Sequence, residues 1–84
     1  MKQPKHKDSL EFSVDEVVKL FNYPVIKTER GTEFLPENIG LIVGVLVLNE
    51  QVEMVVKFVD RVTQFTKPEF YCHYKVLRDD FDVE

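Results

Sequence analysis

The stretch that decides the fold is Ile39-Gly40-Leu41-Ile42-Val43-Gly44-Val45-Leu46-Val47-Leu48. It is apolar all round, so periodicity alone cannot separate a buried strand from a buried helix. Five of its ten residues are β-branched and two are glycine, which favours a strand, with a buried helix as the open alternative. At this length it falls well short of the roughly 20 residues that a membrane-spanning helix needs.

The segments after this stretch carry two further patterns. Residues 50–65 place valines at helical spacing on one face, opposite charged residues, and Asn49 could cap the resulting long helix. Residues 69–77 alternate apolar and polar side chains, which is typical of a strand. A strand at 39–48, a helix at 50–65 and a strand at 69–77 would form a right-handed crossover with parallel strands.

Two elements are expected before the apolar stretch. A helix over 14–22 begins at Ser13, which can form a capping box with Glu16, and ends before Pro24. Residues 25–35 read as a β-hairpin with a turn at 29–32.

The predicted fold class is therefore α+β. A small mixed β-sheet, made of the hairpin plus two strands, would be covered on one face by a short N-terminal helix and one long helix. The predicted organisation is a flexible basic arm at 1–8, a single α+β domain at 9–78 and an acidic tail at 79–84.

Composition limits the function classes. The chain has 84 residues, a net charge of −4 and a calculated pI of about 5.1, which argues against a general binder of nucleic acid or of anionic membranes. Its single cysteine, Cys72, cannot form an internal disulfide, which fits a reducing compartment. No apolar segment of the signal-peptide kind follows the basic N-terminus, so a cytoplasmic location is expected.

Residues capable of catalysis or metal binding are few. Cys72 and His73 would point to opposite faces of a strand and could not act as a nucleophile–base pair. No Cys-x-x-Cys or other metal-ligand spacing is present. Gly40 and Gly44 lie inside the apolar stretch, which indicates a close backbone approach, under a crossing helix or between two chains, and not a phosphate loop. We therefore expect no enzyme activity, no cofactor and no metal; the alternative is a minimal site around His73 with a neighbouring tyrosine.

The aromatic residues near the C-terminus and the acidic tail are the remaining candidates for binding. Phe70, Tyr71 and Tyr74 are expected to pack in the core and at the sheet edge, in preference to stacking on single-stranded nucleic acid. The tail alternates acidic and apolar side chains, a pattern that can dock on a basic-rimmed groove. Its candidate partner-binding residues are Asp79, Asp80, Phe81 and Asp82.

The segment from Phe12 to Val62 resembles a winged helix of the excisionase and MerR type. Phe12-Ser13-Val14-Asp15-Glu16-Val17-Val18-Lys19-Leu20 is similar to the first helix of such domains, and the hairpin around Arg30-Gly31 could be the wing. The resemblance implies DNA contacts by Lys27 and Arg30 and a helix opening at Pro36. Because Pro24 follows the first helix closely, the recognition helix of that family has no room.

The function expected from the sequence is a non-catalytic protein–protein interaction module, acting as a small regulator or inhibitor of a larger protein. A truncated winged-helix DNA-binding regulator is the alternative. Homodimerisation is expected, with the long helix or the sheet edge as the interface.

Overall fold

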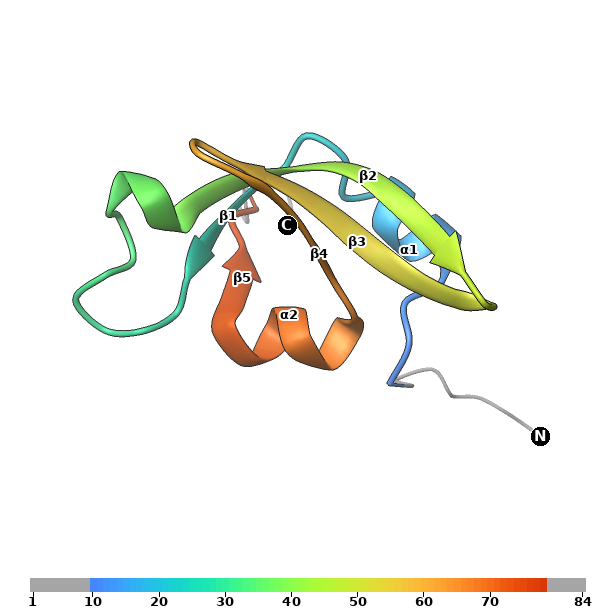
Figure 1. Ribbon diagram of the computed structural model, residues 1–84. Coiled ribbons are helices and arrows are strands. Elements are labelled where there is room, and N and C mark those ends of the chain that lie inside the picture. The colour runs from blue at the N-terminus through green and yellow to red at the C-terminus, as the bar shows by residue number, and fades with distance from the viewer. Residues whose placement is uncertain (1–9, 79–84) are drawn as a thin grey trace.

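The computed structural model describes residues 10–78. These residues fold into one five-stranded sheet with two short α-helices and one 3₁₀ turn (Figure 1). The elements are α1 (Val14–Val18), β1 (Pro24–Lys27), η2 (Pro36–Asn38), β2 (Ile39–Leu48), β3 (Gln51–Phe58), β4 (Val62–Phe65), α2 (Lys67–His73) and β5 (Tyr74–Val76). The strand order is β4-β3-β2-β1-β5, and all neighbouring strands are antiparallel. The predicted mixed sheet with parallel strands is therefore wrong.

The apolar stretch forms β2 with the predicted bounds, 39–48, so the strand prediction is confirmed. A β-bulge interrupts its pairing with β3 between Ile42 and Gly44. The extra residue reverses which positions point inward, because strand side chains alternate with a period of two. Gly40 and Ile42 face inward before the bulge, and Val45 packs on the core after it. The stretch shows no alternation in sequence because its outward-facing residues, such as Leu41 and Leu48, are apolar as well.

The predicted long helix over 50–65 is wrong, because these residues form β3, a tight turn and β4. The β2–β3 connection is a two-residue turn in which Asn49 and Glu50 have φ of 51° and 67°. Positive φ at both positions is the geometry of a type I′ hairpin turn, and Asn tolerates it well. Asn49 therefore reverses the chain instead of capping a helix.

The C-terminal segment also differs from its prediction as a strand over 69–77. Thr66 and Glu69 form a capping box that starts α2, and Pro68 occupies the first turn, where its missing N–H costs nothing. Only Tyr74–Val76 is a strand, and it pairs with the outer edge of β1. The helix α2 thus links β4 and β5, the two edge strands, beneath the curved sheet (Figure 1).

The N-terminal half is partly as expected. Helix α1 begins after Ser13 with the predicted capping box, but it ends at Val18, and the chain continues through turns to Asn22, which has φ of 73°. The hairpin predicted over 25–35 does not form. Strand β1 instead pairs with residues 39–41 of β2, and a loop with the turn η2 connects them.

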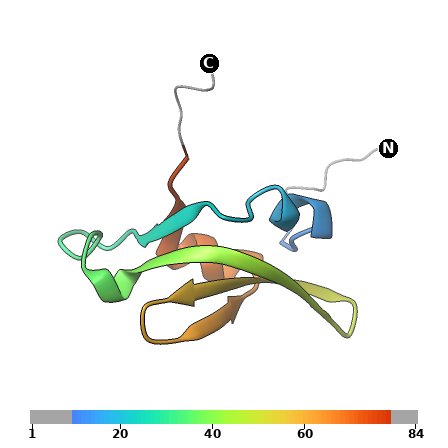
Figure 2. The same ribbon diagram turned by 90° about the horizontal axis from the view of Figure 1, so that it is seen from above.

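The core lies between the sheet and the two helices. Seen from above, α2 lies behind the strands of the sheet (Figure 2). Phe70 of α2 and Val17 of α1 are fully buried against strand residues such as Met54. The ring of Phe70 stacks on that of Tyr74, with centroids 5.9 Å apart and planes 13° from parallel. Core packing of Phe70 and Tyr74 is thereby confirmed, whereas Tyr71 is 47% exposed.

Candidate functional site

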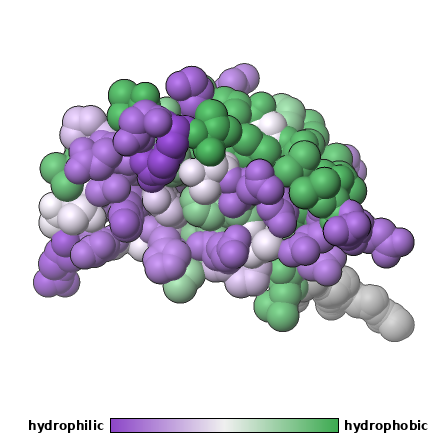
Figure 3. Space-filling view, viewed as in Figure 1, coloured by the Kyte–Doolittle hydropathy of each residue, from purple (hydrophilic) through white to green (hydrophobic). Residues whose placement is uncertain are grey.

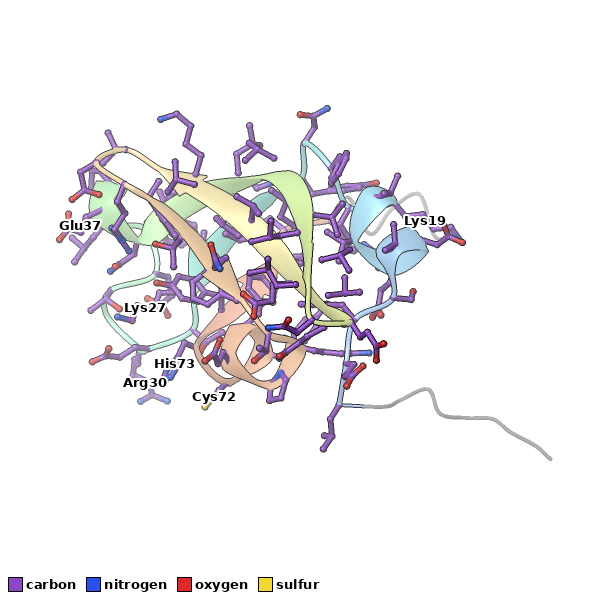
Figure 4. All side chains as sticks on the ribbon, turned by 45° about the vertical axis from the view of Figure 1, so that its right-hand side comes forward. Lys19, Lys27, Arg30, Glu37, Cys72 and His73 are labelled. Atoms are coloured by element: carbon purple, nitrogen blue, oxygen red, sulfur yellow. The ribbon has the colours of Figure 1, made fainter. Side chains whose placement is uncertain are left out.

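The two residues with nucleophilic or basic side chains, Cys72 and His73, lie at the end of α2, not on a strand. Both are exposed, and Figure 4 shows them at the surface near the loop that follows β1. Within residues 10–78, no group of three or more His, Cys, Asp or Glu side chains could hold a metal ion. The side chains of Cys72 and His73 are both open to solvent.

The residues proposed as DNA-wing contacts do not lie on a wing. Lys27 ends β1 and Arg30 lies in the following loop, and Figure 4 shows both at the same end of the molecule as His73. The winged-helix resemblance also requires a helix over 36–48, which instead forms η2 and β2. The fold expected from that resemblance is absent. The other predicted binding residues, Asp79, Asp80, Phe81 and Asp82, lie outside the described part of the chain.

The convex face of the sheet carries apolar side chains that neither α1 nor α2, the two α-helices within residues 10–78, covers. We call this set the apolar outer face; it comprises Leu41, Val43, Leu46, Leu48, Val55 and Val62. Val62, Leu48 and Val43 are 61%, 49% and 42% exposed. Figure 3 shows apolar side chains gathered over the region of β2 and β3. Contiguous exposed apolar surface of this kind commonly marks an interaction site.

Two opposite charges lie within the apolar outer face. On β3, Glu53 and Lys57 point to the same side as Val55, which lies midway between them, while the intervening residues Met54 and Val56 are buried. Their cross-strand partners on β2 are Leu46 for Glu53 and Leu41 for Lys57. The face therefore carries one negative and one positive side chain, each two residues from Val55 along β3.

The sequence of β3 contains the alternation that produces this face, but the spacing of its valines also fits a helix. Residues 52, 54, 56 and 58 face inward and residues 51, 53, 55 and 57 face outward. Val52, Val55 and Val56 fit a helical stripe equally well, so their spacing also predicts a helix. The β-branched content of 52–62 was the indication of a strand.

A pocket of about 490 Å³ lies where α1, α2 and β5 meet. Its lining residues are Glu16, Lys19, Leu20, Tyr71, Lys75, Val76 and Arg78. Figure 2 shows α1 and β5 on the side of the molecule opposite β4. The carboxylate of Glu16 pairs with Lys67 Nζ at 2.9 Å, so the single acidic group of the pocket lining is already neutralised.

Tyr71 lines this pocket, and its pKa is shifted by burial and by the neighbouring charges. Burial raises the pKa of the Tyr71 phenol above its ordinary value, and the nearby Glu16 carboxylate raises it further. Lys67 and Arg78 act in the opposite direction, but the pKa of Tyr71 remains raised. At neutral pH the phenol is therefore protonated and can donate a hydrogen bond.

No helix within residues 10–78 has the length and apolar character needed to cross a membrane. No protein-family model, no curated protein and no solved structure matches the chain.

Proposed function

We propose that the protein is a non-catalytic protein–protein interaction module that self-associates through the apolar outer face. The single observation that carries this proposal is a sheet face with exposed valine and leucine side chains on β2 and β4, on either side of the half-buried Val55 of β3. Burial of apolar surface drives most protein association, at about 25 cal/mol per Å² removed from water. In this proposal the dimer is the form that acts as a small regulator.

The charge pattern favours a second copy as the occupant of this face. In a two-fold symmetric dimer every contact occurs twice. If a first residue of one protomer contacts a second residue of the other, that second residue in the first protomer also contacts the first residue in the other. A two-fold axis between the faces, crossing β3 at Val55, would set Glu53 of one protomer against Lys57 of the other. The same axis would set Leu41 of one protomer against Leu46 of the other. Apolar residues would therefore meet apolar residues, and opposite charges would meet each other.

The test is the molar mass in solution, measured by size-exclusion chromatography with light scattering over a range of concentrations. We expect the wild-type protein to form dimers. Glu53→Lys or Lys57→Glu alone would place like charges together and shift the equilibrium towards monomer. The double variant with both substitutions would restore the dimer. Glu29→Lys, an exposed change in the loop after β1, is the matched control.

The rescue by the double variant is the decisive outcome. A wild-type protein that stays monomeric at every concentration would contradict the proposal. A dimer that persists in both single variants would show that the interface lies elsewhere. Circular dichroism of each variant would confirm that the fold is intact.

A further inference from the structure

We propose that the pocket between α1, α2 and β5 binds a small organic phosphate, with Lys19, Lys75 and Arg78 holding the phosphate group. This inference is independent of the apolar outer face. The pocket draws side chains from both ends of the described chain, because the residue that follows α1 is Lys19, while β5 and its following residues supply Lys75 and Arg78. Its volume of about 490 Å³ is within the range of small-molecule sites.

The charge balance of the pocket is the first argument. The protein as a whole has a net charge of −4, yet three cationic side chains line this one pocket. Within residues 10–78, none of the three forms an ion pair, whereas the single acidic group of the lining, Glu16, is paired with Lys67. Three cations without an acidic partner in the described part of the chain create a positive potential that favours a multiply charged anion.

The donor set is the second argument, and it fits phosphate. The Arg78 guanidinium offers a planar fork of N–H donors that matches phosphate oxygens, while lysines supply mobile point charges. The Arg78 guanidinium lies 5.7 Å from the centroid of the Tyr23 ring, which steadies its position beside the pocket. The protonated phenol of Tyr71 adds a neutral donor on the same wall.

The apolar part of the lining is the third argument, and it favours an organic phosphate. Leu20 is 5% exposed and Val76 is half-buried, so together they supply a nonpolar wall. The Tyr71 ring is held edge-on to Phe70, with centroids 4.9 Å apart. A ligand with a ring or short hydrocarbon body beside its phosphate would contact this wall while its charge met the cations.

Phenyl phosphate is a suitable probe, titrated into the full 84-residue chain and followed by NMR shifts of backbone amides. The acidic residues that follow Arg78 are then present in every sample. We expect saturable shifts confined to the pocket lining. Lys75→Gln and Arg78→Gln should each weaken binding about tenfold or more, since a hydrogen bond to a charged group contributes about 1.5–3 kcal/mol. Arg30→Gln, an exposed change in the loop after β1 that lies outside the pocket lining, should leave the affinity unchanged.

Two further probes separate the contributions of charge and ring. Phenol should bind at least tenfold more weakly than phenyl phosphate, and inorganic phosphate should bind detectably but more weakly. No saturable binding of phenyl phosphate, or binding that Lys75→Gln and Arg78→Gln leave unchanged, would overturn the proposal. Equal affinity for inorganic phosphate and phenyl phosphate would refute the role of the apolar wall.

Discussion

A Cβ atom on Gly40 would lie 2.7 Å from Cγ1 of Val56 and 2.9 Å from the ring of Phe58. The close approach at Gly40 is therefore that of side chains from the paired strand β3. It differs from the predicted backbone approach under a crossing helix or between two chains. Gly44, at which a Cβ would make only an ordinary contact of 3.5 Å with Val55, does not make such an approach.

Gly40→Ala should destabilise the protein. The added methyl group would force Val56 and Phe58, both buried, out of their positions at a cost of about 1–3 kcal/mol. Urea denaturation would measure the loss in the free energy of unfolding. Gly44→Ala on the same strand is the control and should change it much less. Equal effects for the two variants would show that the crowding at Gly40 relaxes without cost.

Glu50→Gly should stabilise the β2–β3 hairpin. Glu50 has φ of 67°, a conformation that costs a residue with a Cβ about 1–2 kcal/mol and that glycine adopts freely. After the entropy of glycine in the unfolded chain is subtracted, a gain of about 0.5–1 kcal/mol in unfolding free energy is expected. Gln51→Gly, one residue into β3, should be destabilising by the same measurement. A loss of stability in Glu50→Gly would contradict the type I′ turn.

The raised pKa of Tyr71 predicts a pH dependence of stability. Below the ordinary tyrosine pKa of 10.0 the phenol is neutral in both the folded and the unfolded state, so its ionisation does not change the free energy of unfolding. As pH rises above this value, the unfolded chain loses the proton while folded Tyr71 retains it. The free energy of unfolding should therefore fall, until pH passes the folded pKa.

Tyr71→Phe is the variant that isolates this effect. Denaturation of wild type and variant at neutral and strongly alkaline pH should show a smaller alkaline loss in Tyr71→Phe. Absorbance titration of tyrosinate in the two proteins would identify the phenol that Tyr71→Phe removes. That phenol should be one that ionises above the ordinary tyrosine pKa of 10.0. An identical alkaline loss in both proteins would mean that Tyr71 is not protected by burial.

Phe70 should be the most sensitive position of α2. Its ring is fully buried and stacks on Tyr74 as well as meeting Phe65 at 5.9 Å. Phe70→Ala should lower the unfolding free energy by about 3–5 kcal/mol, because it removes the ring and leaves a cavity. Cys72→Ala, an exposed change two residues away on the same helix, should have little effect in thermal denaturation. Similar melting temperatures for both variants would refute the central role of Phe70.

Local signals near Ser13 and in the apolar stretch predicted structure correctly. The Ser13–Glu16 capping box and the strand at 39–48 both depend on residues close in sequence, and both are present. The pairing of strands was not accessible in the same way. Lys27 of β1 lies opposite Tyr74 of β5, and no local pattern indicates that contact.

The main error is the long helix predicted over 50–65, and it arose because the valine pattern there fits both the helical and the strand period. The valines at 52, 55, 56, 59 and 62 lie at helical spacing, but the fold uses the alternation of 52, 54, 56 and 58. The turn at Asn49-Glu50 lacks the glycine that usually marks a type I′ hairpin, so no strong signal opposed the helix. The basic pocket was missed for a related reason, since Lys19, Lys75 and Arg78 converge only through the tertiary fold.

The pairing of β1 with β5 has a consequence for how the protein is made. The backbone N–H and the hydroxyl of Thr28 both donate to the carbonyl of His73, which lies 45 residues further along the chain. A nascent polypeptide on the ribosome cannot close this contact until His73 has been synthesised. Until then β1 has a bare edge, and a truncated product ending before Tyr74 would be a natural target for chaperones and proteases.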